Sequence, residues 1–417
     1  MAKPGRGLRH GPKRPAHGGR SFQPGGSLPG LAPHLPTHWS RCVKISFLVV
    51  KGLPGKGGIE KYTHQLGRRL ADRGHDVSVY CTSGPECPKG PFDGMEIIPV
   101  PAIRKRSLEK MSAVWAAALH LAWRTGSDIA HVHAFGPGMA SCLPRLRGMK
   151  TVVQGHGIEW LRSRWGHFGR FFLKATEWPS VRFPHRVTVV SKTQREYLKK
   201  RYGLDAEYIP VGVGDPKLRP PRLIKEKFGL ENKGYLLFAA RLVREKGAHF
   251  LIQAFRKLDT DLKLVIAGDS PYEQEYKDEL KQMAAGDPRI VFTGFVTGEL
   301  LEELFSNAYI FLQPSTIEGL PIGMLEAMSY GLCCVSSDIP ENQEGIAGQG
   351  HVFENESPND LHRVLKDLLQ KPEEIKALGE AASQRVLGEH HWDQITSRFE
   401  SFYRSLMETP RSQEAIA

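Results

Sequence analysis

Short runs of β-branched and apolar residues alternate with amphipathic stretches of helical length along most of this chain. In the first half, the runs of strand length occupy residues 43–50, 77–82, 128–133, 151–154 and 186–190. The alternation pauses in a Pro- and Gly-rich stretch at residues 208–222 and restarts with runs at residues 235–240, 262–267, 290–295, 309–313 and 333–336. Such alternation is typical of a parallel sheet with helices on its faces. The restart therefore predicts two consecutive doubly wound, Rossmann-like units.

The length of the chain agrees with two domains, because 417 residues exceed what one ordinary domain holds. We predict a first domain at residues 41–210 and a second at residues 211–389, with residues 390–408 packing back on the first. In open sheets of this class, ligands bind at the carboxyl ends of the strands. The functional residues are therefore expected in the loops that follow strands.

The net charge of +12 is unevenly distributed, because six of the cations lie in residues 1–40, which hold no acid, and the remainder carries +6. This segment is rich in Gly, Pro and His and too poor in apolar residues to form a core, so we predict a disordered basic tail. A basic arm that contacts anionic lipid or nucleic acid is the alternative interpretation. The chain has no nucleic-acid recognition motif, and we expect no nucleic-acid partner.

The six cysteines form no C-x-x-C pair, and several lie inside strand-like runs. This usage is typical of buried thiols in a reducing compartment. No apolar stretch approaches the roughly 20 residues that span a bilayer. We therefore expect a cytoplasmic protein whose contact with a membrane is peripheral.

Two loops after strands carry candidate ligand-binding residues. The glycine-rich loop at residues 52–58 precedes a helix, so its backbone allows close approach and offers free N–H groups to anionic oxygens. A plain tight turn is an equally good interpretation, since the loop has neither Walker A nor G-x-G-x-x-G spacing. In the second half, Arg241 and Lys246 follow a strand, and two cations there suit a diphosphate leaving group. The alternative is a solvated loop of a basic protein.

The most informative string reads E-G-L-P-x-G-x-x-E-A-M from Glu318 to Met328. A strand ends just before it, and Pro321 suits the first turn of a helix. Glu318 is then expected in the loop, with Glu326 one to two turns inside the helix. We expect Glu326 to share an otherwise apolar helix face, where a carboxylate needs partners such as ribose hydroxyls. A charge on a solvated face is the alternative for either residue taken singly. The apolar residues of the expected face are Ile322, Leu325 and Met328.

From residue 43 to about residue 403, the chain resembles the retaining glycosyltransferases of family 4, also called glycosyl transferases group 1. The resemblance rests on the run at residues 57–60 (Gly-Gly-Ile-Glu), on Arg241 with Lys246, and on Glu318 and Glu326 spaced as E-x7-E. It implies the GT-B fold, in which two facing Rossmann-like, doubly wound α/β domains enclose an interdomain cleft. The first domain would lie on the acceptor side, and the second would bind the nucleotide sugar.

The resemblance also implies roles for individual residues. Arg241 and Lys246 would hold the donor diphosphate, Glu326 the ribose hydroxyls, and Glu318 would lie near the donor sugar. His156, which follows the strand at residues 151–154, matches an active-site histidine that positions the donor sugar; a purely structural histidine is the alternative. The backbone expected to cradle the sugar and phosphate belongs to Gly57, Gly58, Gly319, Leu320, Pro321 and Ile322.

The activity implied by the resemblance is transfer of a hexosyl group from a nucleoside-diphosphate sugar to a hydroxyl of a glycan or lipid-linked acceptor. Such transfer serves cell-envelope or exported polysaccharide and glycolipid synthesis. The family implies retention at the anomeric carbon without a cofactor or an obligatory metal, so the two cations would do the work of a metal ion. A same-face route is favoured over a nucleophilic role for Glu318.

Two basic, aromatic stretches bear on the acceptor. One covers residues 159–172, and the other has three cations at residues 104–106 followed by apolar residues up to Trp123. Such surfaces suit anionic membranes and lipid-linked acceptors. Packing of these aromatic residues against the first sheet is the alternative. We favour peripheral docking on the inner face of the plasma membrane.

Two other functions are compatible with a fold of this class. A nonhydrolysing UDP-sugar 2-epimerase has a similar fold but lacks the E-G-L-P string. A nonenzymatic sugar-nucleotide binding module is the second alternative. The complete set of Arg241, Lys246, Glu318 and Glu326 argues against this second alternative.

Overall fold

The structure is a computed structural model, and it describes residues 42–409 except positions 54, 56, 85, 86, 88, 104–107, 125, 159, 161–165 and 272. The predicted tail at residues 1–40 lies outside the described residues. The described residues belong to one unit of the structure, which holds two sheets.

The first sheet has eight strands in the order β3-β4-β2-β1-β5-β6-β7-β8. All neighbours are parallel except β3 and β4. The strands are β1 Lys44–Val50, β2 Asp76–Thr82, β3 Gly90–Phe92, β4 Met95–Val100, β5 Ile129–His133, β6 Lys150–Gly155, β7 Arg186–Val189 and β8 Glu207–Tyr208. The helices of this half are α1 Gly58–Asp72, α2 Glu109–Trp123, α3 Phe135–Gly138, α4 Cys142–Leu146, α5 His167–Arg182 and α6 Lys192–Tyr202.

The second sheet has six parallel strands in the order β11-β10-β9-β12-β13-β14. They are β9 Tyr235–Ala239, β10 Lys263–Ala267, β11 Ile290–Gly294, β12 Ile310–Gln313, β13 Cys333–Ser337 and β14 Gly350–Phe353. The helices are α7 Leu223–Phe228, α8 Ala248–Phe255, α9 Gln274–Ala284, α10 Gly298–Asn307, α11 Ile322–Ser329, α12 Pro340–Ile346, α13 Pro358–Leu368, α14 Pro372–Glu389 and α15 Trp392–Glu408.

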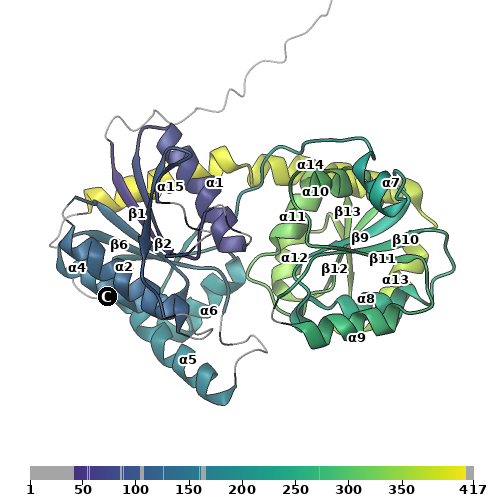
Figure 1. The fold of residues 1–417 in the computed structure, drawn as a ribbon, viewed down its shortest axis with the longest axis horizontal. Helices are drawn as coiled ribbons and strands as arrows, with labels where there is room; N and C mark the ends of the chain where they lie inside the picture. Colours follow the sequence, from purple (N-terminus) through teal and green to yellow (C-terminus); the bar gives the residue numbers. More distant parts are fainter. Residues whose placement is uncertain are drawn as a thin grey trace, which may run out of the picture. The chain divides into compact units, whose positions relative to one another are not determined.

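Each sheet is covered by helices on both faces, as the sequence predicts (Figure 1). In the first sheet, α1 and α15 cover one face, and α2 and α6 cover the other. In the second sheet, α10, α11 and α14 cover one face, and α8, α9 and α13 cover the other. Because strands covered on both faces bury both sets of side chains, they read as continuous apolar runs rather than as alternation.

All ten predicted strands are present, with ends that agree to within one or two residues. Strands β3, β4, β8 and β14 were not predicted. The first two form a short hairpin around Asp93 and Gly94, and the last two have two and four residues. A capping box at the start of α6 forms in part, because the Ser191 hydroxyl accepts the backbone N–H of Gln194. The buried Gln194 amide itself has no hydrogen-bond partner among the described residues, so the reciprocal bond is missing.

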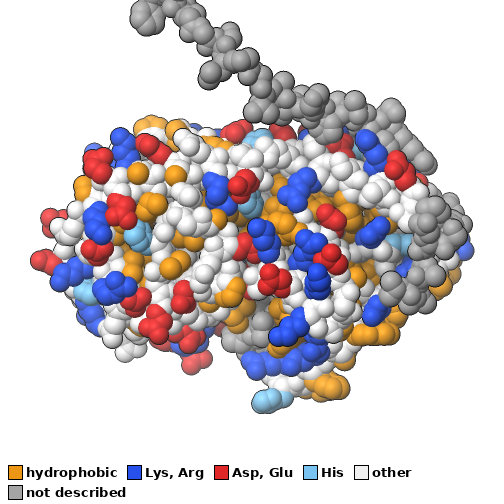
Figure 2. All heavy atoms as spheres, turned by 180° about the vertical axis from the view of Figure 1, so that it is seen from behind, with side chains coloured by type: hydrophobic (Ala, Val, Ile, Leu, Met, Phe, Trp, Pro, Cys, Tyr) orange, Lys and Arg blue, Asp and Glu red, His pale blue; other side chains and the backbone are white. Residues whose placement is uncertain are grey.

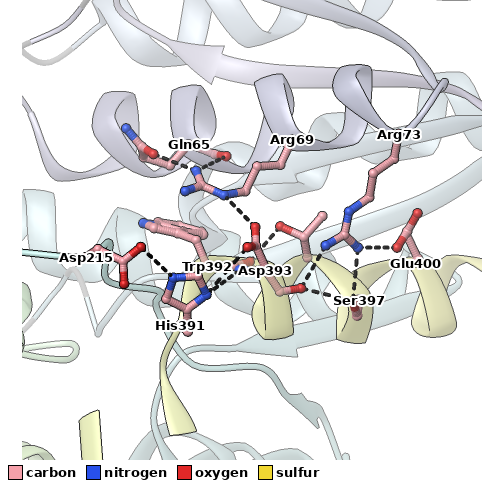
Figure 3. A network of polar contacts seen from close by, with 10 residues as sticks. Gln65, Arg69, Arg73, Asp215, His391, Trp392, Asp393, Ser397 and Glu400 are labelled. Atoms are coloured by element: carbon pink, nitrogen blue, oxygen red, sulfur yellow. Dashed lines mark hydrogen bonds and ion pairs between the residues drawn. The ribbon is translucent and has the colours of Figure 1, made fainter. Parts of the chain in front are cut away.

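Helix α15 packs on α1 of the first sheet through a set of polar contacts (Figure 3). Arg69 of α1 binds Asp393 of α15, and Arg73, the residue that follows α1, binds Glu400 of α15. Burial raises the pKa of Glu400, but hydrogen bonds from His75 and Arg73 outweigh it and hold this pKa below its usual value. An isolated parallel β-bridge joins Val213 to His391, the residue before α15. Residues 211–213 and 390–392 therefore lie side by side.

A buried histidine of β5 joins α15 to the centre of the first sheet. His131 is fully buried, its Nδ1 lies 2.7 Å from the Tyr403 hydroxyl of α15, and its Nε2 lies 3.1 Å from Oε1 of Gln154. Burial lowers the pKa of His131 to about 3, so the ring is neutral at pH 7. The Gln154 oxygen can only accept, so Nε2 carries the proton and Nδ1 accepts the Tyr403 hydroxyl.

We predict that Tyr403→Phe lowers the free energy of unfolding by about 1–3 kcal/mol, because Nδ1 of a buried neutral His131 loses its donor. Urea denaturation measures the change. A double-mutant cycle with His131→Phe should show coupling between the two positions, since they share one hydrogen bond. Strictly additive effects would contradict this assignment.

Candidate active site

The loop after β9 lies against the loop after β12. The first loop contains a turn at Arg244–Lys246 and continues to Gly247, whose φ is +72°. A Cβ on Gly247 would lie 2.1 Å from the carbonyl oxygen of Pro314, so only glycine fits. The backbone N–H of Thr316 donates to the Glu245 carbonyl at 2.9 Å. The predicted cationic loop and the predicted acidic loop are therefore held together by their backbones.

At this junction, Lys246 and Glu318 form an ion pair between Nζ and Oε1. Both side chains are largely buried, with 16% and 8% of their surface exposed. Nε2 of Gln313, at the end of β12, donates to the same carboxylate oxygen at 2.7 Å. The pair joins two of the predicted site residues, and Gln313 fixes its orientation.

Glu326 lies inside α11, as predicted, but not on the face that the sequence indicates. Leu325 and Met328 are fully buried against the second sheet, whereas Glu326 is only partly buried, beside the partly buried Ile322. The expectation of a carboxylate on an otherwise apolar face is therefore wrong. At about 100° per residue, Leu325 and Met328 share the core-facing side, and Glu326 turns away from it.

Loops from the two sheets meet at backbone distance. A Cβ on Gly319 would lie 2.2 Å from the carbonyl oxygen of His156, so the loop after β6 touches the loop after β12. A Cβ on Gly58 would lie 3.7 Å from Cδ1 of Ile322, so the start of α1 faces the start of α11. Parts of the predicted site that are far apart in the sequence are thus neighbours.

The glycine-rich loop leads into α1, whose N-cap residue is Gly57. Because glycine has no side chain, it does not cap the first backbone N–H groups of the helix. The carboxylate of Glu60 folds back on this loop and accepts the backbone N–H of Lys51 at 3.3 Å. Glu60 is buried, and a Cβ on Gly57 would lie 2.0 Å from its Oε2. A negative charge at the first turn of a helix is favourable.

Arg241 and Glu326 have no side-chain hydrogen bond or ion pair with other described residues. Arg241 is exposed two residues beyond the end of β9. A Cβ on Gly323 of α11 would lie 3.3 Å from the carbonyl oxygen of Ala239, which places the start of α11 beside the end of β9. Leu320 and Pro321, which precede α11, are buried.

Three polar residues of strands β5 and β12 were not predicted from the sequence to have a role. Gln313 holds Glu318, and its position as the last residue of a strand before the acidic loop was the available signal. His131 and His133 lie on one face of β5, and their i, i+2 spacing in a strand predicts a shared face. Nδ1 of His133 lies 3.0 Å from Nε2 of His156.

The described residues contain no group of three or more His, Cys, Asp or Glu side chains that could hold a metal ion. The charged groups that the two loops bring together are the Lys246 ammonium and the Glu318 carboxylate.

Known protein families match most of the chain. Residues 56–214 match the family profile described as Glycosyltransferase Family 4, and residues 222–385 match the profile described as Glycosyl transferases group 1. The alpha-D-kanosaminyltransferase of Streptomyces kanamyceticus is 26% identical over 315 residues, which cover 66% of this chain and 80% of that protein.

Two solved structures have a similar fold. Sucrose-phosphate synthase of Thermosynechococcus elongatus superposes with a TM-score of 0.75 at 22% identity, covering 87% of this chain and 99% of that one. HepE of Anabaena, in complex with UDP and glucose, gives a TM-score of 0.73 at 18% identity over 87% of this chain and 100% of that one. The chain belongs to the group 1 and family 4 glycosyltransferases, and its fold is GT-B.

We predict that Gly319→Ala slows sugar transfer by about tenfold or more, because the added Cβ would push the loops after β6 and β12 apart, and small displacements of reacting groups are costly. Turnover of a nucleotide sugar measures the effect. Gly388→Ala is the matched control, since its Cβ meets nothing within 4 Å in helix α14. Unchanged turnover in Gly319→Ala would contradict a role for this contact.

Proposed function

We propose that this glycosyltransferase moves a hexosyl group from a nucleoside-diphosphate sugar to an acceptor hydroxyl with retention at the anomeric carbon. The observation that supports it most is the buried pair of Lys246 and Glu318 next to the contact between Gly319 and His156. A cation, an acid and a histidine from both halves of the chain meet there at the carboxyl ends of strands, where ligands bind in sheets of this class.

Lys246 and Arg241 would neutralise the departing diphosphate. As the bond to the sugar breaks, negative charge grows on the phosphate, and fixed cations stabilise that charge more in the transition state than in the ground state. Lys246 is held by Glu318, whereas the Arg241 side chain is exposed at the end of β9. These two cations would serve in place of a metal ion. Glu326 would bind the ribose hydroxyls from the partly exposed side of α11.

Glu318 is better suited to orient Lys246 than to attack the sugar. Its Oε1 accepts from both the Lys246 ammonium and the Gln313 amide, and both contacts lower the electron density available to a nucleophile. This arrangement favours a same-face route, in which the leaving phosphate accepts the proton of the acceptor. His156 would position the donor sugar from the other side.

We predict that Lys246→Ala and Glu326→Ala each reduce transfer about 10²- to 10³-fold, the usual cost of removing one preorganised electrostatic contact. Release of nucleoside diphosphate from UDP, GDP, ADP or dTDP sugars measures transfer. The same nucleotides should raise the melting temperature of the wild type more than that of the variants, since ligands stabilise the state they bind.

Lys257→Ala is the control for this pair, because Lys257 binds Asn359 on the surface beyond α8. Normal turnover in both site variants would refute the assignment. Conversion of a UDP sugar to its 2-epimer without an acceptor would support the isomerase alternative. Binding without either reaction would support a nonenzymatic module.

For the acceptor, we propose a glycan or a lipid-linked substrate. The enzyme would reach it at the inner face of the plasma membrane. The product would serve the synthesis of cell-envelope or exported polysaccharide or of glycolipid. The first turns of α5 expose Phe168 and Phe171, with 82% and 71% of their surface accessible, and Arg170 lies between them. Basic and hydrophobic side chains lie together where α5 lies, at the lower edge in Figure 2. Aromatic residues beside cations suit an anionic bilayer surface.

The neighbouring segments support docking in part. Residues 104–106 and 161–165 lie outside the described residues. Trp160 donates from Nε1 to the buried Glu177 at 3.0 Å, so this aromatic residue is anchored to α5. On α2, Val114 is buried against the sheet and Trp115 is half-buried, whereas 80% of Trp123 is exposed. Across the described helices, none is both long and apolar enough to cross a bilayer.

We predict that the protein sediments with phosphatidylglycerol vesicles at low salt and that Phe168→Ser combined with Phe171→Ser weakens this binding about tenfold or more, since each buried Phe contributes about 1.5–3 kcal/mol. Leu218→Ser is the control, because it removes an exposed apolar residue of the linker, which is 72% accessible. Absence of sedimentation by the wild type at low salt would remove the membrane proposal.

A further inference from the structure

Helix α12 begins beside the acidic loop that carries Glu318. A Cβ on Gly345 would lie 2.9 Å from Cγ of Pro321, so α12 packs directly on the E-G-L-P string. At the start of the helix, Nδ2 of Asn342 donates to the Gln313 carbonyl at 3.4 Å, and the Gln313 side chain in turn holds Glu318. The start of α12 therefore borders the candidate active site.

The first turn of α12 carries Glu341 on the side that meets this loop. Glu341 lies four residues before Gly345, and side chains at this spacing share one face of a helix. The face that packs on Pro321 at Gly345 therefore carries Glu341 one turn nearer to the carboxyl end of β13. Desolvation, and then the charges of Glu318 and Glu344, raise the pKa of Glu341, which agrees with this placement.

Glu341 differs from its acidic neighbours in the partners of its carboxylate. Glu318 is paired with Lys246, and both carboxylate oxygens of Glu344 accept the backbone N–H of Lys192, at 2.8 and 3.0 Å. Glu341 is half-buried, and its carboxylate binds only its own backbone N–H among the described residues. Such a group costs free energy unless a ligand or water supplies donors for its remaining lone pairs.

We infer that Glu341 is a specificity-determining residue of the donor site, whose carboxylate accepts hydroxyl groups of the transferred hexose and repels donors whose sugar is a hexuronate. The inference rests on the proposed function, because it takes the donor sugar to lie beside Glu318. Hydrogen bonds from hydroxyls to a carboxylate are charge-assisted and therefore strong. Like charges brought together are unfavourable, so the group that binds a neutral sugar also rejects an anionic one.

The cations around Glu341 are engaged elsewhere. The Lys246 ammonium is paired with Glu318. Lys192 faces α12 with its backbone, but its ammonium lies over the Tyr208 ring, 5.9 Å from the ring centroid. A carboxylate on the sugar would therefore meet the charge of Glu341 without a cation to compensate it.

The test measures the binding of matched donors, which needs no acceptor. The nucleoside diphosphate that raises the melting temperature most identifies the base. That diphosphate is then compared as the ester of a neutral hexose and of the corresponding hexuronate, for example UDP-glucose with UDP-glucuronate. Calorimetric titration at pH 8, well above the usual pKa of a carboxyl group, gives both dissociation constants.

We expect the wild type to bind the neutral donor about 100-fold more tightly than the anionic one. Glu341→Gln should reduce this ratio about tenfold or more, because an amide still binds hydroxyls but does not repel an anion. Glu341→Asp should keep most of the ratio, since the charge remains. Glu380→Gln is the matched control, because it removes an equal charge from an exposed position of α14.

The nucleoside diphosphate without a sugar separates this inference from the proposed function. It should bind equally to the wild type and to both Glu341 variants. A ratio near or below one in the wild type, or an unchanged ratio in Glu341→Gln, would overturn the inference and leave the diphosphate site intact. A lower melting temperature of Glu341→Gln with an unchanged ratio would show that Glu341 only stabilises α12. If no nucleoside diphosphate binds the wild type, the proposed function fails, and the inference fails with it.

Discussion

The ion pair between Lys246 and Glu318 is the interaction on which the rest of the site depends. It is largely buried, and buried ion pairs are weak contributors to stability, because desolvation offsets much of the attraction. The pair instead fixes the positions of the Lys246 and Glu318 side chains. Gly247 lets the loop that carries Lys246 approach Pro314, and Gln313 at the end of β12 holds the carboxylate.

The first sheet supplies the other half of the site through buried polar groups. His131 lies in the middle of β5 and His133 is its last residue, and desolvation keeps both buried rings neutral. Each polar atom of these rings has a partner, which is the condition under which a buried polar network stabilises a single arrangement. One ring ties α15 to the sheet, and the other reaches His156.

Much of the fold was predictable, because strands buried on both faces read directly as apolar runs, as at residues 235–239 and 263–267. The exceptions have physical reasons. Strand β8 has two residues and β14 has four, too few to show a pattern, and β3 and β4 pair through a hairpin inside a segment that reads as a loop. Glu326 was assigned to the correct helix but to the wrong face, because the sequence alone did not show which side of α11 meets the sheet.

The sequence by itself determined the alternation of strands and helices, the positions of the loops that follow the strands, and the chemical types of the residues in them. These are local properties, set by periodicity and by the conformations of Gly and Pro. Only the tertiary structure decided which of those loops touch, because contacts such as Gly319 with His156 and Lys246 with Glu318 join segments separated by 72 or more positions. Proton positions were also decided there, since the tautomer of a histidine depends on partners from other elements and not on its neighbours in the chain.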